Sequence, residues 1–91
     1  MNGKWKINNC SEEITFNSTH ATLGEGNVIA EYKIMRNDKI KFYIKRTHKC
    51  SMIQIEILRA LDHTVFYKIK NRKNLELLDR RFDIVLLASK T

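Results

Sequence analysis

Residues 28–45 carry the pattern that most restricts the fold of this chain. Apolar side chains occupy every second position in two runs separated by the polar tip 35–38: Val28, Ala30, Tyr32 and Ile34, then Ile40, Phe42 and Ile44. Glu31 and Lys33 alternate with the first run, and Lys39, Lys41 and Lys45 alternate with the second. A period of two on both sides of a short polar tip is typical of a β-hairpin. The pattern therefore predicts a hairpin with one apolar face and one lysine-rich outer face.

Alternating segments on both sides of this hairpin predict further short strands. They cover 3–9, 13–17, 21–23, 64–70, 75–78 and 82–88, and turn residues separate them at intervals of roughly ten residues. The chain contains no proline to protect an exposed edge strand, and closing the sheet on itself removes the edges. We therefore predict one all-β domain over 1–91, a small antiparallel up-and-down barrel of about eight strands.

Two segments carry further expectations. In 51–61, Ile53, Ile55 and Ile57 alternate as in a strand, whereas Ser51 followed by Gln54 matches a helical capping box. Strand is preferred there, because three isoleucines at period two are costly in a helix. The last strand is expected to turn one set of side chains inward and to leave an apolar second face open to oligomerisation; the inward set is Phe82, Ile84, Leu86 and Ala88.

The order of these segments resembles the small bacterial lipocalin-like and META-type barrels. The resemblance rests on a spaced pattern over most of the chain: Gly3-Lys4-Trp5, Glu13-Ile14-Thr15-Phe16-Asn17, Tyr32-Lys33-Ile34, Asn37-Asp38, Lys39-Ile40-Lys41-Phe42, Ile57-Leu58 and Leu75-Glu76-Leu77-Leu78. It implies a lipocalin-like strand order in which the tryptophan plugs one end of the barrel. It also implies a site for a small apolar ligand, lined by Trp5, Tyr32 and Phe42. A tryptophan in the position of Trp5 is more commonly part of the packed core than of a ligand site.

The basic residues suggest a binding surface instead of a catalytic one. The chain has a formal charge of +7, and residues 33–49 hold a net +6 of it. The predicted partner-binding residues lie on the outer faces of the hairpin and of segment 64–70: Lys33, Arg36, Lys39, Lys41, Tyr43, Lys45, Arg46, Phe66, Lys68 and Lys70. The first prediction is a non-enzymatic module, an inhibitor or accessory subunit, that recognises an acidic protein. The alternative is single-stranded nucleic acid, because lysines interleaved with exposed rings suit phosphates and bases.

Catalytic motifs, metal ligands, cysteines and apolar runs give less information about the function than the basic residues do. No catalytic motif is present, and we expect no cofactor. His20, His48 and His63 do not combine with Cys10 and Cys50 at metal-ligand spacing. The two cysteines could form one disulfide or remain thiols. No run approaches the roughly 20 apolar residues that span a membrane. The chain is therefore expected to be cytosolic, or exported after loss of a leader.

Overall fold

The computed structural model describes residues 2–8, 10–24, 27–45 and 51–91 and contains eight strands and one helix. The elements are β1 (Gly3–Ile7), β2 (Glu13–Phe16), β3 (His20–Leu23), β4 (Asn27–Ile34), β5 (Ile40–Ile44), α1 (Met52–His63), β6 (Phe66–Lys70), β7 (Asn74–Leu78) and β8 (Ile84–Lys90).

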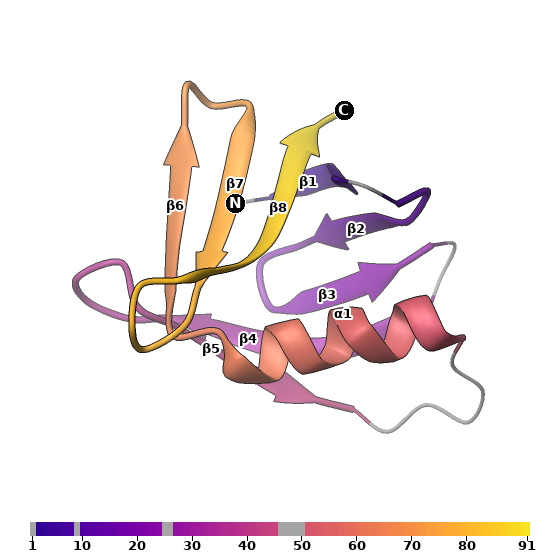
Figure 1. The fold of residues 1–91 in the computed structure, drawn as a ribbon, viewed down its shortest axis with the longest axis horizontal. Helices are drawn as coiled ribbons and strands as arrows, with labels where there is room; N and C mark the ends of the chain where they lie inside the picture. The colour runs from indigo at the N-terminus through magenta and orange to yellow at the C-terminus, as the bar shows by residue number, and fades with distance from the viewer. Residues whose placement is uncertain (1, 9, 25–26, 46–50) are drawn as a thin grey trace.

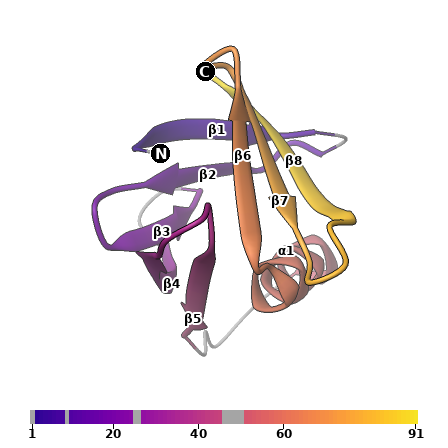
Figure 2. The ribbon, with the colours of Figure 1, turned by 90° about the vertical axis from the view of Figure 1, so that its left-hand side faces the viewer.

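The strands form one antiparallel sheet that curls into a nearly closed barrel (Figure 1). Its order is β5-β4-β3-β2-β1-β8-β7-β6, so consecutive strands pair from β1 to β5 and from β6 to β8, and β1 pairs with β8. The edge strands β5 and β6 meet at one bridge, Lys39 opposite Phe66, and then diverge. Helix α1 lies across the opening and contacts β5 and β8 (Figures 1 and 2). The predicted small all-β barrel is confirmed.

The inward faces of the strands supply a continuous apolar core. Side chains from all parts of the chain contribute to it, including Trp5, Phe16, Tyr32, Phe42, Leu75 and Leu86. Three rings gather at its centre: Phe16 and Tyr32 meet edge-on at a centroid distance of 5.4 Å, and Phe16 and Phe42 lie 6.2 Å apart. The core therefore consists largely of the residues that the period-two pattern had placed inward.

The segment 51–61 is a helix, so the preference for a strand was wrong. The Ser51 hydroxyl accepts from the Gln54 N–H (3.2 Å), and the Ser51 N–H donates to the Gln54 side-chain oxygen (3.1 Å). These bonds satisfy backbone groups that a helix start leaves unpaired. The helix buries Ile57 and Leu61, four residues apart, and leaves Ile53 and Ile55 exposed at 44% and 38%. Packing of this stripe against the barrel outweighs the period-two pattern of the isoleucines.

Two strands depart from simple alternation. Along β4, Ala30 pairs with Ala21 but Val28 pairs with Thr22, and this irregularity leaves Ile29 buried and Val28 exposed. In the last segment, the strand begins only at Ile84, which is itself exposed, so its predicted inward position was wrong. Phe82 lies outside the strand and is 64% exposed, so the same prediction was wrong there. Leu86 and Ala88 are buried as expected.

Candidate functional site

The outer face of the β4–β5 hairpin carries lysine side chains as predicted. Lys33 lies directly opposite Lys41 in the register, and Glu31 lies opposite Tyr43. All four side chains are exposed, and Tyr43 is 53% exposed. Like charges placed opposite each other in a sheet repel. Within the described part of the chain, no ion pair relieves Lys33, Lys39 or Lys41.

The hairpin tip brings this face to β6. Asn37 and Asp38 both have positive φ, 61° and 59°, a conformation that asparagine and aspartate tolerate better than most residues. The Asp38 carbonyl at the tip accepts from the Tyr67 N–H at 3.0 Å. Arg36 is exposed at the same tip. The turn therefore fixes where Lys39, just before β5, meets the other edge of the sheet.

Lys39 and Phe66 join the two outer faces into one. They are directly opposite, flanked by the Tyr67–Asp38 bond and by the Ile40 N–H donating to the Val65 carbonyl at 2.8 Å. In an antiparallel pair with this bonding pattern, side chains lie close together on the same side. We call the resulting patch the basic surface; it comprises Lys33, Lys39, Lys41, Tyr43, Phe66 and Lys68.

Lys68 and Lys70 continue the outward positions of β6, and both are exposed. Lys68 lies opposite Glu76, and the Lys70 ammonium lies 3.2 Å from the Glu76 carboxylate. A cleft of about 330 Å³ beside the strand is lined by Asp38, Tyr67, Lys68, Ile69 and Lys70. Because Lys70 already has an acidic partner, Lys68 contributes more free charge to the basic surface.

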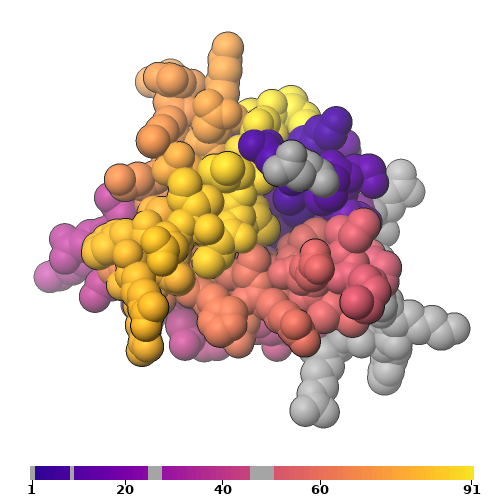
Figure 3. All heavy atoms as spheres, in the orientation of Figure 1, coloured from indigo at the N-terminus to yellow at the C-terminus, as the bar shows by residue number. Residues whose placement is uncertain are grey.

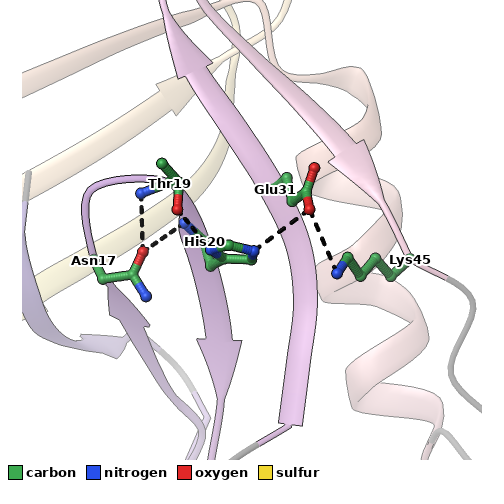
Figure 4. Close-up of polar contacts among 5 residues, drawn as sticks. All are labelled: Asn17, Thr19, His20, Glu31 and Lys45. Carbon is green, nitrogen blue, oxygen red and sulfur yellow. Dashed lines mark hydrogen bonds and ion pairs between the residues drawn. The ribbon is translucent and has the colours of Figure 1, made fainter.

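Glu31 on β4 occupies the middle of a small polar cluster that includes the β2–β3 turn, the start of β3 and Lys45 after β5 (Figure 4). Its carboxylate lies 3.5 Å from the Lys45 ammonium and 3.4 Å from His20 Nε2. His20 Nδ1 lies 2.6 Å from the Thr19 hydroxyl, and Asn17 Oδ1 accepts from the backbone N–H groups of Thr19 and His20. The predicted site residue Lys45 is therefore partly neutralised by Glu31.

Thr19, His20 and Glu31 touch in the order hydroxyl, imidazole and carboxylate, which is also the order in a hydrolytic triad. His20 and Glu31 lie on neighbouring strands and Thr19 lies in the turn before β3; Thr19 and Glu31 are exposed. We interpret the cluster as a set of surface contacts that link the turn before β3 to β4 and to Lys45, the residue after β5.

The residues implied by the small-ligand alternative are packed into the core. Trp5, Tyr32 and Phe42 are all buried. Tyr32 and Phe42 contact each other at a centroid distance of 5.9 Å, and the Lys90 ammonium covers the Trp5 ring at 4.8 Å. Gly3 has φ of 118°, a backbone conformation that residues with a side chain rarely adopt, which accounts for the glycine two residues before the tryptophan. This arrangement supports the core role expected for Trp5.

Sequence reasoning did not identify two exposed apolar features. One is Phe82, whose ring stacks on Phe66. The other is a groove of about 430 Å³ between α1 and β8, lined mainly by aliphatic side chains such as Ile53, Ile57 and Leu87, with Cys10 and Glu56 also present. Both depend on the helix and on a loop conformation that the period-two pattern does not contain.

Other predictions fall partly outside the described residues. Arg46 of the predicted surface lies there, as does Cys50, while Cys10 is a half-buried thiol. In the part of the chain that the structure describes, no three histidine, cysteine, aspartate or glutamate side chains gather as a metal site would require. Over the same residues, no helix has the length and apolar character needed to span a membrane.

Comparison with known proteins adds no assignment: no family model matches the sequence, and neither the curated proteins nor the solved structures contain a match.

Proposed function

We propose that the protein is a non-enzymatic binding module whose basic surface binds single-stranded nucleic acid. The observation that carries the proposal is the pairing of Lys39 with Phe66. It places a cation beside an aromatic ring and makes the lysines of the hairpin continuous with Lys68 of β6. Binding of single strands requires this combination, because cations attract the phosphates and rings stack on the bases.

The charge of the surface supports a polyanionic partner. Lys33 and Lys41 are opposed without an acidic partner among the described residues, so their mutual repulsion is relieved when an anion lies between them. The net charge of +7 adds long-range attraction for such a partner. A chain of phosphates can meet several lysines along one strand at once.

The rings support nucleic acid over an acidic protein. Tyr43 lies between Lys41 and Lys45 on the outer face of β5 and is exposed. Exposed rings offer stacking surfaces to bases. Lysine, in contrast, is depleted from the cores of protein interfaces. An acidic protein, which the sequence favoured, is the second candidate; the opposed Lys33 and Lys41 support it, since clustered charge speeds association with an acidic surface.

Charge reversal tests the proposal against a matched control. Lys39→Glu with Lys41→Glu changes two outward lysines two residues apart at the start of β5. Lys4→Glu with Lys6→Glu makes the same charge change at two exposed positions on β1. Fluorescence anisotropy with a labelled thymidine oligonucleotide at low salt is the measurement. We expect the first variant to lose about tenfold or more in affinity and the control to lose much less.

Salt dependence provides an independent readout. Each phosphate contact to a single strand contributes about 0.7 to the slope of log affinity against log salt. Loss of two contacts should therefore reduce that slope by roughly 1.4 in Lys39→Glu with Lys41→Glu. Absence of any oligonucleotide binding by the wild-type protein at low salt would refute the proposal, as would equal losses in the two double variants.

A further inference from the structure

Phe66 and Phe82 form a stacked pair of rings at one end of the basic surface. Their centroids lie 4.5 Å apart, and the ring planes differ by 18°. Phe66 is half-buried on β6, whereas Phe82, in the loop between β7 and β8, is 64% exposed. With one face on Phe66 and most of its area exposed, the Phe82 ring presents its other face to solvent.

The loop holds Phe82 in a conformation that a bulky residue rarely adopts. Its φ is 64°, in the left-handed region. The Asp79 carboxylate accepts from the backbone N–H groups of Arg81 (2.8 Å) and Asp83 (3.0 Å), and the Asp79 carbonyl accepts from the Phe82 N–H (3.0 Å). The ring is therefore positioned before a ligand arrives, which lowers the entropy lost on binding.

Basic side chains surround the stack. Lys39 lies opposite Phe66, and Lys68 is the next outward residue of β6. Arg80 and Arg81 are exposed in the loop that carries Phe82, as is the acidic Asp83. Figure 2 faces this end of the molecule, with the hairpin tip on one side of the start of β6 and the β7–β8 loop on the other. Figure 3 shows the tip and the loop at the same end of the molecular surface.

Packing alone accounts for part of this arrangement. Leu78 lies opposite Phe66 across β6 and β7; it is only 5% exposed, yet it does not belong to the main core cluster. A small apolar cluster on the outside of the barrel explains why Phe66 is half-buried. It does not require the next ring to lie flat on Phe66 with its second face exposed.

We propose that Phe82, supported by Phe66 at the end of the basic surface, is a base-stacking residue. An unpaired nucleobase lies on the free face of the Phe82 ring, and the adjacent phosphates lie toward Lys39 and Lys68. The assignment rests on the proposed binding of single-stranded nucleic acid and adds to it a further residue that contacts a base.

Two substitutions of Phe82 separate stacking from packing. Phe82→Leu keeps an aliphatic side chain over Phe66 but removes the planar face, and Phe82→Trp enlarges that face. With a thymidine oligonucleotide, we expect Phe82→Leu to bind about tenfold more weakly and Phe82→Trp to bind at least as tightly as the wild type. Ile84→Ala, at an exposed apolar position two residues away, is the control and should bind as the wild type does.

An abasic oligonucleotide of equal length isolates the contribution of the base. Wild type and Phe82→Leu should bind it with equal affinity, because it offers phosphates without bases. The indole introduced by Phe82→Trp should lose fluorescence with the thymidine strand and not with the abasic strand, and the wild type, whose single tryptophan is the buried Trp5, supplies the background. This readout does not depend on whether Phe82→Leu folds; circular dichroism and urea unfolding establish the folding of each variant.

The outcomes distinguish this assignment from the proposed function. If Phe82→Leu binds thymidine strands like the wild type while Lys39→Glu with Lys41→Glu does not bind, the stacking assignment is overturned and nucleic-acid binding stands. An introduced indole that stays unquenched in a bound complex of Phe82→Trp overturns the assignment as well. If the wild type binds polyglutamate more tightly than any oligonucleotide, both proposals are overturned in favour of an acidic polypeptide.

Discussion

Tyr32 brings a hydroxyl group into the apolar core. Its ring contacts Phe16 and Phe42, and its hydroxyl donates to the backbone carbonyl of Asn17. The hydroxyl thereby keeps a hydrogen-bond partner after it has left water, as buried polar groups generally do. Burial raises the pKa of Tyr32 above its ordinary value of 10.0, because removal from water disfavours the charged form.

This pKa shift links stability to alkaline pH. Between the pKa values of the unfolded and folded states, the folded protein retains a proton that the unfolded chain has lost. The free energy of unfolding therefore falls as the pH rises above 10.0. Tyr32→Phe should remove this part of the pH dependence and, at neutral pH, cost about 1 kcal/mol for the lost hydrogen bond.

Urea unfolding at neutral and at alkaline pH measures both effects. The control is Tyr43→Phe, which makes the same substitution at a tyrosine that is exposed on the outer face of β5. If the free energy of unfolding of Tyr32→Phe falls at alkaline pH as much as that of the wild type, the pH dependence does not come from Tyr32.

At this scale, alternation predicted which residues are buried only where a strand is regular. It placed Tyr32 and Phe42 inward correctly, since both follow the period of two. It failed at Phe82 because the hydrogen bonds of Asp79 and the positive φ take that residue out of the strand. The lysines of the basic surface were predictable for the same reason as the core, and the stacked pair was not.

Helix α1 forms from a segment whose sequence fits both a strand and a helix. Ile53, Ile55 and Ile57 fit a strand, while Ile57 and Leu61 fit one face of a helix. The sequence contains both patterns, and their relative weight depends on what each face contacts. The barrel provides an apolar opening for Ile57 and Leu61, and the capping box of Ser51 and Gln54 defines where the helix begins.

Removal of the cap tests how much the helix start contributes. Ser51→Ala should lower the free energy of unfolding by about 1 kcal/mol, because the N–H of Gln54 loses its acceptor. Ser51→Asp should keep most of the free energy of unfolding of the wild type. Ser11→Ala, at an exposed serine outside any helix, serves as the control. Equal effects of Ser51→Ala and Ser11→Ala in urea unfolding would show that the cap does not stabilise the protein.

For the whole molecule, chain order determined most of the architecture. Successive hairpins give a sheet in which sequence neighbours are also spatial neighbours, so local patterns were sufficient to predict a barrel. The contact between β5 and β6, and the helix between them, were not predictable in this way. Lys39 and Phe66 are far apart in sequence, and nothing in either segment indicates that they pair.

Substitution of Leu61 tests how much the packing of the helix on the barrel contributes to the free energy of unfolding. Leu61 is fully buried in the core, on the helix that contacts both β5 and β8. Leu61→Ala should therefore lower the free energy of unfolding by about 2–5 kcal/mol. The control, Ile53→Ala on the same helix, removes an exposed side chain and should cost well under half as much. Similar losses for the two variants in urea unfolding would argue against tight packing of the helix on the barrel.

The junction of β5 and β6 has a mechanical consequence. Among the described residues, one pair and two backbone hydrogen bonds join these strands, whereas every other neighbouring pair of strands shares at least three residue pairs. A barrel opens locally most readily where the fewest contacts join its strands. A nucleic acid bound across Lys39 and Phe66 would hold β5 and β6 together. Binding at the basic surface would therefore stabilise the closed form of the barrel.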